Sequence, residues 1–385
     1  MGMLKTMQMM LTAMVAMAVA VPALAQEPLA QADTRAHERH AHDARAGELR
    51  EQIRARQARA AEIRVRTRAE ARTRAEAVQR GRGQSAQTER IARTFQLGAA
   101  GELDLANVSG NIVVRRAPGQ ETTVEVVKTA RGASDEDAKA ILEAVQVEIS
   151  ERGPRLEVRA RFPDRDEMRR LGRRAMPVDV AVTVAAPAAT RVRAQSVAGS
   201  VTVENITGEV TAESVSGEVR IVNGGRVSAA KSISGSVEIT GAATERALHA
   251  STVSGNLTLR KVKADQIDAG TISGEILLED VNSALVMAQT VSWDVRFSGP
   301  LAANARFHVG SHSGNVHLAL RPAGGFEVEA SSFSGSVQSD FPLTVQPGVQ
   351  QAARHRQNAL RGVHGDGSAL LNLTTFSGNI TIQKR

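Results

Sequence analysis

The sequence predicts an all-β protein, a right-handed parallel β-solenoid of about ten coils. Three observations support this fold class. A phrase of the form Ser/Thr, apolar, Ser, Gly returns every 18 to 21 residues through most of residues 191–385. β-Branched and polar residues alternate after each copy, and aromatic residues make up only 2% of the chain. A period of this length indicates repeated units that bury their apolar face only against a neighbour.

The copy at residues 214–221, SVSGEVRI, shows the chemistry of one repeat. Val215, Val219 and Ile221 occupy alternate positions, so an extended chain should direct them to one side and the polar residues to the other. Ser followed by Gly predicts a corner, because Gly accepts unusual backbone angles and Ser hydrogen-bonds nearby backbone. The known preference for right-handed crossovers sets the hand of the coil. The predicted corner glycines are Gly110, Gly199, Gly217, Gly235, Gly255, Gly274, Gly314, Gly335 and Gly378.

Residues 1–25 have the features of a secretory signal peptide. Lys5 gives a positive start, residues 11–21 are apolar, and Ala23-Leu-Ala25 is a small-residue cleavage site. Pro22 interrupts the apolar run before it reaches the length of a membrane-spanning helix. We therefore expect export to the periplasm or the cell surface, with no transmembrane segment in the mature chain.

Residues 26–94 form an Arg- and Ala-rich arm that we expect to be helical or disordered. Between residues 34 and 93 the charge balance is +8, whereas the rest of the chain has a balance of −1. The arm is either a spacer or a surface whose arginines bind an anionic envelope polymer. It contains no aromatic residue for base stacking, so nucleic acid is not an expected partner. The candidate binding residues are Arg54, Arg56, Arg59, Arg64, Arg66, Arg68, Arg72 and Arg74.

Two further regions follow the arm. Residues 95–190 are expected to form an N-terminal cap and the first coil, because an unprotected coil end would expose unpaired backbone groups. Ser134, three residues before Asp137, predicts the start of a short helix in this cap. Residues 191–385 are the solenoid repeats, with a loop insertion at residues 340–367 that contains Pro342 and Pro347.

The repeated phrases, together with the alternating run VDVAVTV at residues 178–184 and the following Pro187, resemble the bacterial putative-adhesin family. This family is a domain of unknown function found in envelope proteins. The resemblance covers roughly residues 95–385 and implies a right-handed β-solenoid. The family pattern includes no catalytic residues, so the resemblance assigns none here.

No catalytic, cofactor or metal site is predicted. The chain lacks cysteine, and the three histidines of the arm, His37, His40 and His42, have no second cluster to complete a metal site. Ser228 and Lys231 match a Ser-x-x-Lys motif without its companion motifs.

We predict an exported, non-enzymatic, adhesin-like scaffold that binds or senses a cell-envelope component. An anionic envelope polymer or a surface protein is the expected partner. Trp293, which replaces the corner glycine in one copy, could be a binding anchor or could cover the core where a neighbouring coil is small. The alternative function is a polysaccharide lyase or hydrolase, by analogy with other β-solenoids. It would require carboxylates that converge in a groove. Glu218, Glu275 and Asp294 follow the corner in different coils and could line up as a ladder, but a solvated outer face explains them equally well.

Overall fold

A computed structural model describes residues 85–98, 101–173, 175–344 and 358–385. The predicted signal peptide, the arm as far as residue 84, and all eight candidate arginines therefore lie outside the described residues. The described chain is almost entirely β, with two short helices, α3 (Asp135–Ala144) and α4 (Arg165–Arg170). Neither helix has the length and hydrophobicity that a membrane crossing would require.

The strands of the described residues form two sheets of 13 strands each, here named sheet A and sheet B. In spatial order, sheet A consists of β1 (Ser85–Phe95), β4 (Thr122–Gly132), β7 (Val178–Ala186), β3 (Ile112–Arg116), β9 (Val201–Glu204), β11 (Val219–Val222), β13 (Val237–Thr240), β15 (Leu257–Arg260), β17 (Ile276–Glu279), β19 (Val295–Leu301), β21 (Val316–Pro322), β26 (Ile380–Lys384) and β23 (Val337–Ser339). Sheet B consists of β24 (Ala359–His364), β22 (Phe326–Ser332), β25 (Ala369–Thr375), β20 (Arg306–Ser311), β18 (Asn282–Thr290), β16 (Lys263–Gly270), β14 (Ala247–Ser251), β12 (Arg226–Lys231), β10 (Glu209–Ser214), β8 (Arg191–Ala198), β2 (Glu102–Ser109), β6 (Arg155–Arg161) and β5 (Gln146–Arg152).

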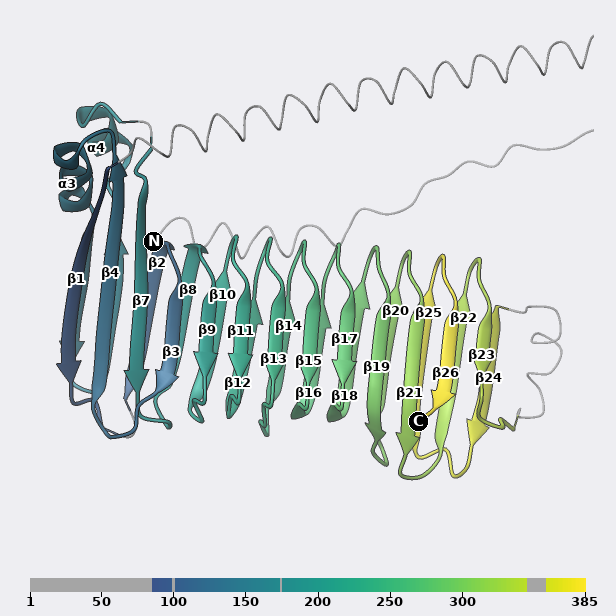
Figure 1. The fold of residues 1–385 in the computed structure, drawn as a ribbon. Coiled ribbons are helices and arrows are strands. Elements are labelled where there is room, and N and C mark those ends of the chain that lie inside the picture. The colour runs from purple at the N-terminus through teal and green to yellow at the C-terminus, as the bar shows by residue number, and fades with distance from the viewer. Residues whose placement is uncertain (1–84, 99–100, 174, 345–357) are drawn as a thin grey trace, which may run out of the picture. The chain divides into compact units, whose positions relative to one another are not determined.

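Corresponding residues of successive repeats lie beside one another in parallel register (Figure 1). Val219 pairs with Val201 on one side and with Val237 on the other. Ile221 lies in the same way between Val203 and Ile239. The chain alternates between the sheets, so each repeat contributes one short strand to each of them. The predicted all-β, repeat-based fold is thus confirmed as two large, mostly parallel sheets of a β-solenoid-like architecture.

One continuous apolar core fills the space between the sheets. Val219 and Ile221 are fully buried, as are the equivalent aliphatic residues of the neighbouring repeats. β-Branched side chains suit this position because they pack well on a pleated surface that is buried on one face. The central repeats therefore stack without any aromatic residue between the sheets.

The N-terminal end is an antiparallel extension of the repeats, and it corrects the predicted limit of the arm. We expected the arm to reach residue 94, but residues 85–95 form β1, which pairs along its whole length with β4. Ile91 packs against the core, and Glu89 forms a 2.6 Å ion pair with the buried Lys128. The boundary was misplaced because the Arg and Thr residues of β1 point to solvent and give it the composition of the arm. The predicted helix is α3, and the Ser134 side chain accepts a hydrogen bond from the Asp137 N–H.

At the C-terminal end, chain order and spatial order differ. The last two strands, β25 and β26, insert between earlier neighbours: β25 lies between β20 and β22, and β26 lies between β21 and β23. The expectation that each repeat follows the one before it is therefore wrong for the final repeat. The predicted loop at 340–367 also contains strand β24. Because β25 lies between β20 and β22, β22 would be the last strand of sheet B, and β24 covers its free edge by antiparallel pairing. No periodic phrase marks β24, so this strand could not be predicted from the repeat pattern.

The repeats become wider toward the C-terminus. In the central repeats a second corner follows each sheet A strand, and non-glycine residues there adopt a positive φ, as at Asn223 (52°) and Asp280 (51°). β19, in contrast, continues to Leu301. The wider core contains Phe297 and Phe307, whose ring centroids lie 4.8 Å apart. The intervals of 21 residues near the C-terminus reflect this greater width.

Candidate functional site

The corner phrase has an arrangement that the sequence alternation did not predict. Ser214 is buried and Val215 is half-exposed, the reverse of what we expected. The Ser214 Oγ donates to the Gly199 carbonyl of the neighbouring repeat at 2.9 Å and accepts from the Gly217 N–H at 2.9 Å. These two bonds satisfy the buried hydroxyl, and the corner therefore reverses the inward and outward pattern of the strand.

This inward hydroxyl recurs along the stack and links each corner to the next. Thr290 donates to the Gly274 carbonyl at 3.0 Å, and Thr375 donates to the Gly314 carbonyl at 2.9 Å. Equivalent bonds are made by Ser232, Thr252, Thr271, Ser311 and Ser332. The first position of the phrase is therefore structural, and the second position faces solvent.

The predicted corner glycines lie in one column. A Cβ added to Gly217 would lie 2.0 Å from the Gly199 carbonyl oxygen, so glycine is required by close backbone contact. The same contact recurs at Gly199, Gly235, Gly255, Gly274, Gly314, Gly335 and Gly378, while Gly110 meets the backbone of Val180 in β7. Trp293 keeps its carbonyl in this column, because Ser311 Oγ donates to it at 2.9 Å and Gly314 packs against it. The Trp293 side chain is 59% exposed, so covering the core is not its role.

The second residues of the phrases form a row on the outer side of the corner that is apolar except for His312, and we name it the apolar edge. Its aliphatic members include Val197 at 47% exposure and Val291 at 43% exposure. Toward the C-terminus the row becomes aromatic, with Phe376 at 48% and Phe333 at 70% exposure. The edge consists of Val108, Val197, Val215, Ile233, Val253, Ile272, Val291, His312, Phe376 and Phe333 in spatial order. Contiguous exposed apolar surface of this kind is typical of interaction sites.

Three rings of the apolar edge are stacked. The ring centroids of His312 and Phe376 are 4.9 Å apart with an interplanar angle of 9°, and those of Phe376 and Phe333 are 4.6 Å apart at 3°. These separations match the spacing of neighbouring strands. Both faces of the Phe376 ring are covered, so its exposed surface is the ring edge. Phe333 ends the stack, and no other described ring is stacked on its second face.

Two depressions lie on sheet B beside this aromatic stack. The first, of about 390 Å³, is lined by Gln289, Gly310, Thr374, His312 and Phe376, together with the buried hydroxyl residues of the corner. The second, of about 180 Å³, lies across the same strands and is lined by Arg306, Phe307, His308, Glu327, Glu329, Leu370, Leu371 and Asn372. Gly310 creates the first depression, because it has no side chain between Gln289 on β18 and Thr374 on β25.

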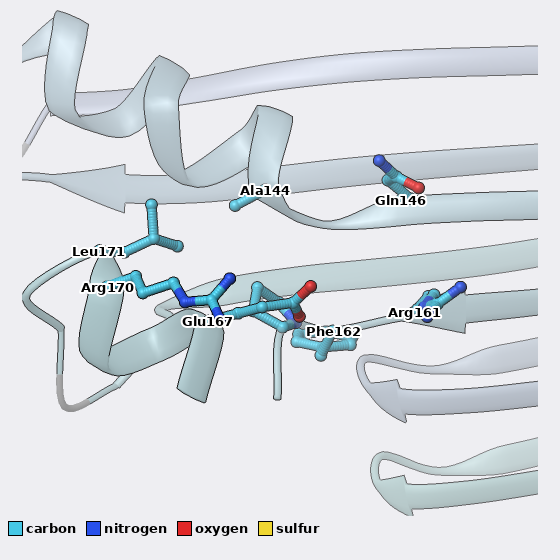
Figure 2. A pocket seen from close by; sticks show the side chains of 8 residues that line it. Ala144, Gln146, Arg161, Phe162, Glu167, Arg170 and Leu171 are labelled. Carbon is cyan, nitrogen blue, oxygen red and sulfur yellow. The ribbon is translucent and has the colours of Figure 1, made fainter. Parts of the chain in front are cut away.

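A separate pocket of about 510 Å³ lies at the N-terminal end. Figure 2 shows Ala144 at the end of α3, Gln146 on the edge strand β5, Arg161 on the neighbouring β6, and Glu167 and Arg170 on α4 around it. The Glu167 carboxylate accepts from the Asp164 N–H as part of a helix cap, and Arg161 pairs with Glu148 at 3.5 Å. These two charges are therefore already used within the fold. Nearby, hydrogen bonds from the Ala133 N–H and from Arg173 lower the pKa of Asp137.

The carboxylates that an enzyme would need are engaged by arginine. Glu218 pairs with Arg220 at 2.7 Å, and Arg296 pairs with Glu275 at 2.6 Å and with Asp294 at 3.4 Å. The Ser228 hydroxyl bonds the Thr211 hydroxyl at 2.9 Å instead of a lysine. In the described part of the chain, no group of three or more His, Asp or Glu residues could hold a metal ion.

Several solved structures are similar to this chain. A putative cell adhesion protein from Clostridium sporogenes is 9% identical, with 78% of this chain and 100% of that chain covered and a TM-score of 0.23. A putative adhesin from Bacteroides fragilis is 12% identical, with 76% and 96% covered and a TM-score of 0.38. A putative lipid binding protein from Parabacteroides distasonis is 12% identical, with 77% and 97% covered and a TM-score of 0.43.

A search of curated proteins finds no match. The family model Toastrack DUF4097, in contrast, matches residues 225–383. These residues include the stacked corners from Gly235 to Gly378, the apolar edge from Ile233 onward and both depressions of sheet B. Residues 225–383 of this chain are therefore similar to the Toastrack DUF4097 family.

Proposed function

We propose that this chain is an exported, non-enzymatic scaffold, adhesin-like, that binds or senses a component of the cell envelope. In this proposal the ten pairs of sheet B and sheet A strands from β2/β3 to β25/β26 are coils of a right-handed parallel solenoid. The segment around α3, β4 and β7 is its N-terminal cap. The signal-peptide features of residues 1–25 support export to the periplasm or the cell surface.

The observation that carries the proposal is the aromatic end of the apolar edge. Phe333 and Phe376 at this end expose 70% and 48% of their surface, and Trp293, which lies beside the edge at the corner position, exposes 59%, all three within four successive corners. The chain has only nine Phe and Trp residues, so this concentration at the solvent boundary is unusual for core-forming residues. Exposed aromatic clusters are typical binding anchors because they desolvate a large area with little loss of conformational freedom.

The arginine-rich arm would supply a second contact surface for an anionic envelope polymer, through long-range attraction. The lyase or hydrolase alternative gains no support from the described residues, since Glu218, Glu275 and Asp294 are all bonded to arginine.

The test is retention of the mature chain on the envelope fraction of the cell that produces it. We expect Phe333→Ser combined with Phe376→Ser to reduce retention at least tenfold, because the partner would lose its apolar contact. Leu171→Ser is the matched control: Leu171 on the C-terminal side of α4 is 49% exposed but lies away from the apolar edge.

Unchanged retention of the double variant would contradict the proposal. Incubation with acidic and neutral polysaccharides provides the second arm of the test. Release of shortened or unsaturated products would replace the scaffold function with the enzymatic alternative.

A further inference from the structure

The outward polar side chains of sheet B differ in how they are bonded along the stack. Nearer the N-terminus they pair across strands: Gln195 with Glu213 at 3.0 Å, and His249 with Asp268 at 3.3 Å. Arg155 and Asp104 form a further pair at 2.6 Å. Such pairs use much of the hydrogen-bonding capacity of this face within the fold.

Over the two depressions most of this pairing stops, and the one ion pair of the described outward side chains there joins Glu327 to Arg361 at 3.9 Å. The side chains of Gln289, Arg306, His308, Asn372 and Thr374 form no hydrogen bond or ion pair with any other described residue. Each side-chain amide offers two donors and an acceptor, and the hydroxyl and imidazole groups add both kinds. The result is a concentration of unused donors and acceptors on one concave part of the sheet.

These unused polar groups and two further features of the face define the chemistry of an occupant. The centre of the face, formed by Gln289, Gly310, Thr374 and Asn372, is uncharged, whereas Arg306, Glu327 and Glu329 line its far end in the second depression. The occupant therefore need not carry charge at the centre. Apolar surface borders the face on one side at Phe376 and on the other at Leu370, which is 43% exposed. An occupant should therefore present many hydroxyl or amide groups together with apolar C–H surface, as a sugar chain does.

A peptide strand fits this face less well. β18, β20, β25 and β22 pair with one another in sequence, so their backbone groups are already bonded and none of these strands is an edge. Peptides that add to sheets use free backbone groups at an edge. A lipid bilayer presents a broad apolar surface and would leave the recessed amides without partners.

We propose that this face, which we name the sheet B groove, binds an uncharged glycan segment of the cell envelope. The inference rests on the proposed scaffold function and specifies its ligand. Gln289 and Asn372 hydrogen-bond sugar hydroxyl or acetamido groups, Gly310 admits one sugar unit between β18 and β25, and the aromatic end of the apolar edge contacts the C–H surface of the chain. The three strands β18, β20 and β25 span about 10 Å at their usual separation.

The experiment uses the full mature chain and four preparations of the same envelope. They are a glycan fraction cleared of protein by protease and of lipid by solvent, the same fraction after periodate oxidation of its vicinal diols, vesicles of the extracted lipid, and the detergent-solubilised envelope proteins. Binding is followed by calorimetry and by the fluorescence of Trp293, the single tryptophan of the chain.

We expect binding to the untreated glycan and its loss after periodate. Gln289→Ala and Asn372→Ala should each weaken binding at least tenfold. Gly310→Val should weaken it further by filling the depression, since an added Cβ there lies 3.0 Å from the Thr374 hydroxyl and 3.5 Å, an ordinary contact, from the Thr374 carbonyl oxygen, and the residue lies in ordinary strand backbone. Gln195→Ala is the matched control, because Gln195 occupies sheet B outside the groove and bonds Glu213.

Each contrary outcome overturns the inference in a distinguishable way. Binding to the solubilised proteins or to lipid vesicles, with none to the glycan, would overturn the glycan assignment while leaving the scaffold function in place. If glycan binding is lost in high salt but is unchanged in Gln289→Ala and Asn372→Ala, the glycan-binding site is the arginine-rich arm and not the sheet B groove. Failure of the wild-type chain to bind any preparation would overturn both the glycan assignment and the scaffold function.

Discussion

The central repeats and the C-terminal repeats share one corner phrase but use its outer surface differently. In the central repeats, from β10 to β17, the apolar edge is aliphatic and largely half-buried, and outward charges pair between repeats, as Arg260 does with Glu238 and Glu279. In the C-terminal repeats, from β18 to β26, the edge becomes aromatic. The neighbouring face of sheet B there is recessed and leaves its amides unpaired with other described residues.

The difference shows which parts of the repeat can vary. The inward hydroxyl, the close backbone contact at the corner and the two buried aliphatic positions are the same in both regions. Only the outward positions and the width of the repeat change. A solenoid-like stack can therefore acquire a binding surface at one place without altering the interactions that hold its repeats together.

The largest expected effect tests whether the two regions depend equally on their buried aliphatic positions. Val219→Asp in β11 and Val316→Asp in β21 each place a charge at a fully buried site. Both should lower the free energy of unfolding by at least about 4 kcal/mol, because the carboxylate loses its hydration and gains no partner.

Urea unfolding measures this loss, with Thr258→Asp, on the outward face of β15, as the control. A much smaller loss for Val316→Asp would show that the wider repeats pack less tightly than the central ones.

The corner contact should have the next largest effect. Gly217→Ala brings a methyl group within 2.0 Å of the Gly199 carbonyl oxygen, and backbone cannot move aside as a flexible side chain could. We expect a loss of about 2–3 kcal/mol from overpacking. Gly270→Ala is the matched control, since a Cβ at Gly270 meets nothing within 4 Å. Equal unfolding midpoints for the two variants would contradict a structural role for the glycine column.

The sequence was sufficient for the repeated part of the fold because its signal is periodic. Val219 and Ile221 recur at a fixed distance from Gly217, and residues with the same surroundings must repeat when units stack. Features that occur once carried no such signal. β1 has the composition of the arm, β24 lies in a Pro- and Gly-containing insertion, and the place of β26 between β21 and β23 depends on contacts distant in sequence.

The candidate site was predictable only in part, for a physical reason that Ser214 illustrates. Simple alternation assigns Ser214 to solvent and Val215 to the core, but a hydroxyl can be buried when it bonds two backbone groups. The apolar edge follows from that reversal, so it could not be inferred from strand periodicity. The groove forms because Gly310 and Asn372 lie on the neighbouring strands β20 and β25, although they are 62 residues apart in sequence. The repeat pattern does not predict this proximity.

The smallest expected effect concerns the hydroxyl link between repeats. Thr290→Val keeps the shape of the side chain but removes the donor to the Gly274 carbonyl, in the corner that carries Val291 of the apolar edge and Trp293. A buried carbonyl that loses one partner costs about 1 kcal/mol. Thr258→Val, at an outward position of β15 without a side-chain hydrogen bond to other described residues, is the matched control and should change the unfolding free energy by less than about 0.5 kcal/mol.

Hydrogen exchange of the Ser292 amide, which donates to the Ile272 carbonyl at 3.1 Å, localises the effect. Faster exchange there in Thr290→Val, but not in Thr258→Val, is expected if the inward hydroxyls hold neighbouring corners together. Equal exchange in both variants would show that strand pairing alone holds neighbouring corners together. The aromatic end of the apolar edge would then be positioned by packing between repeats.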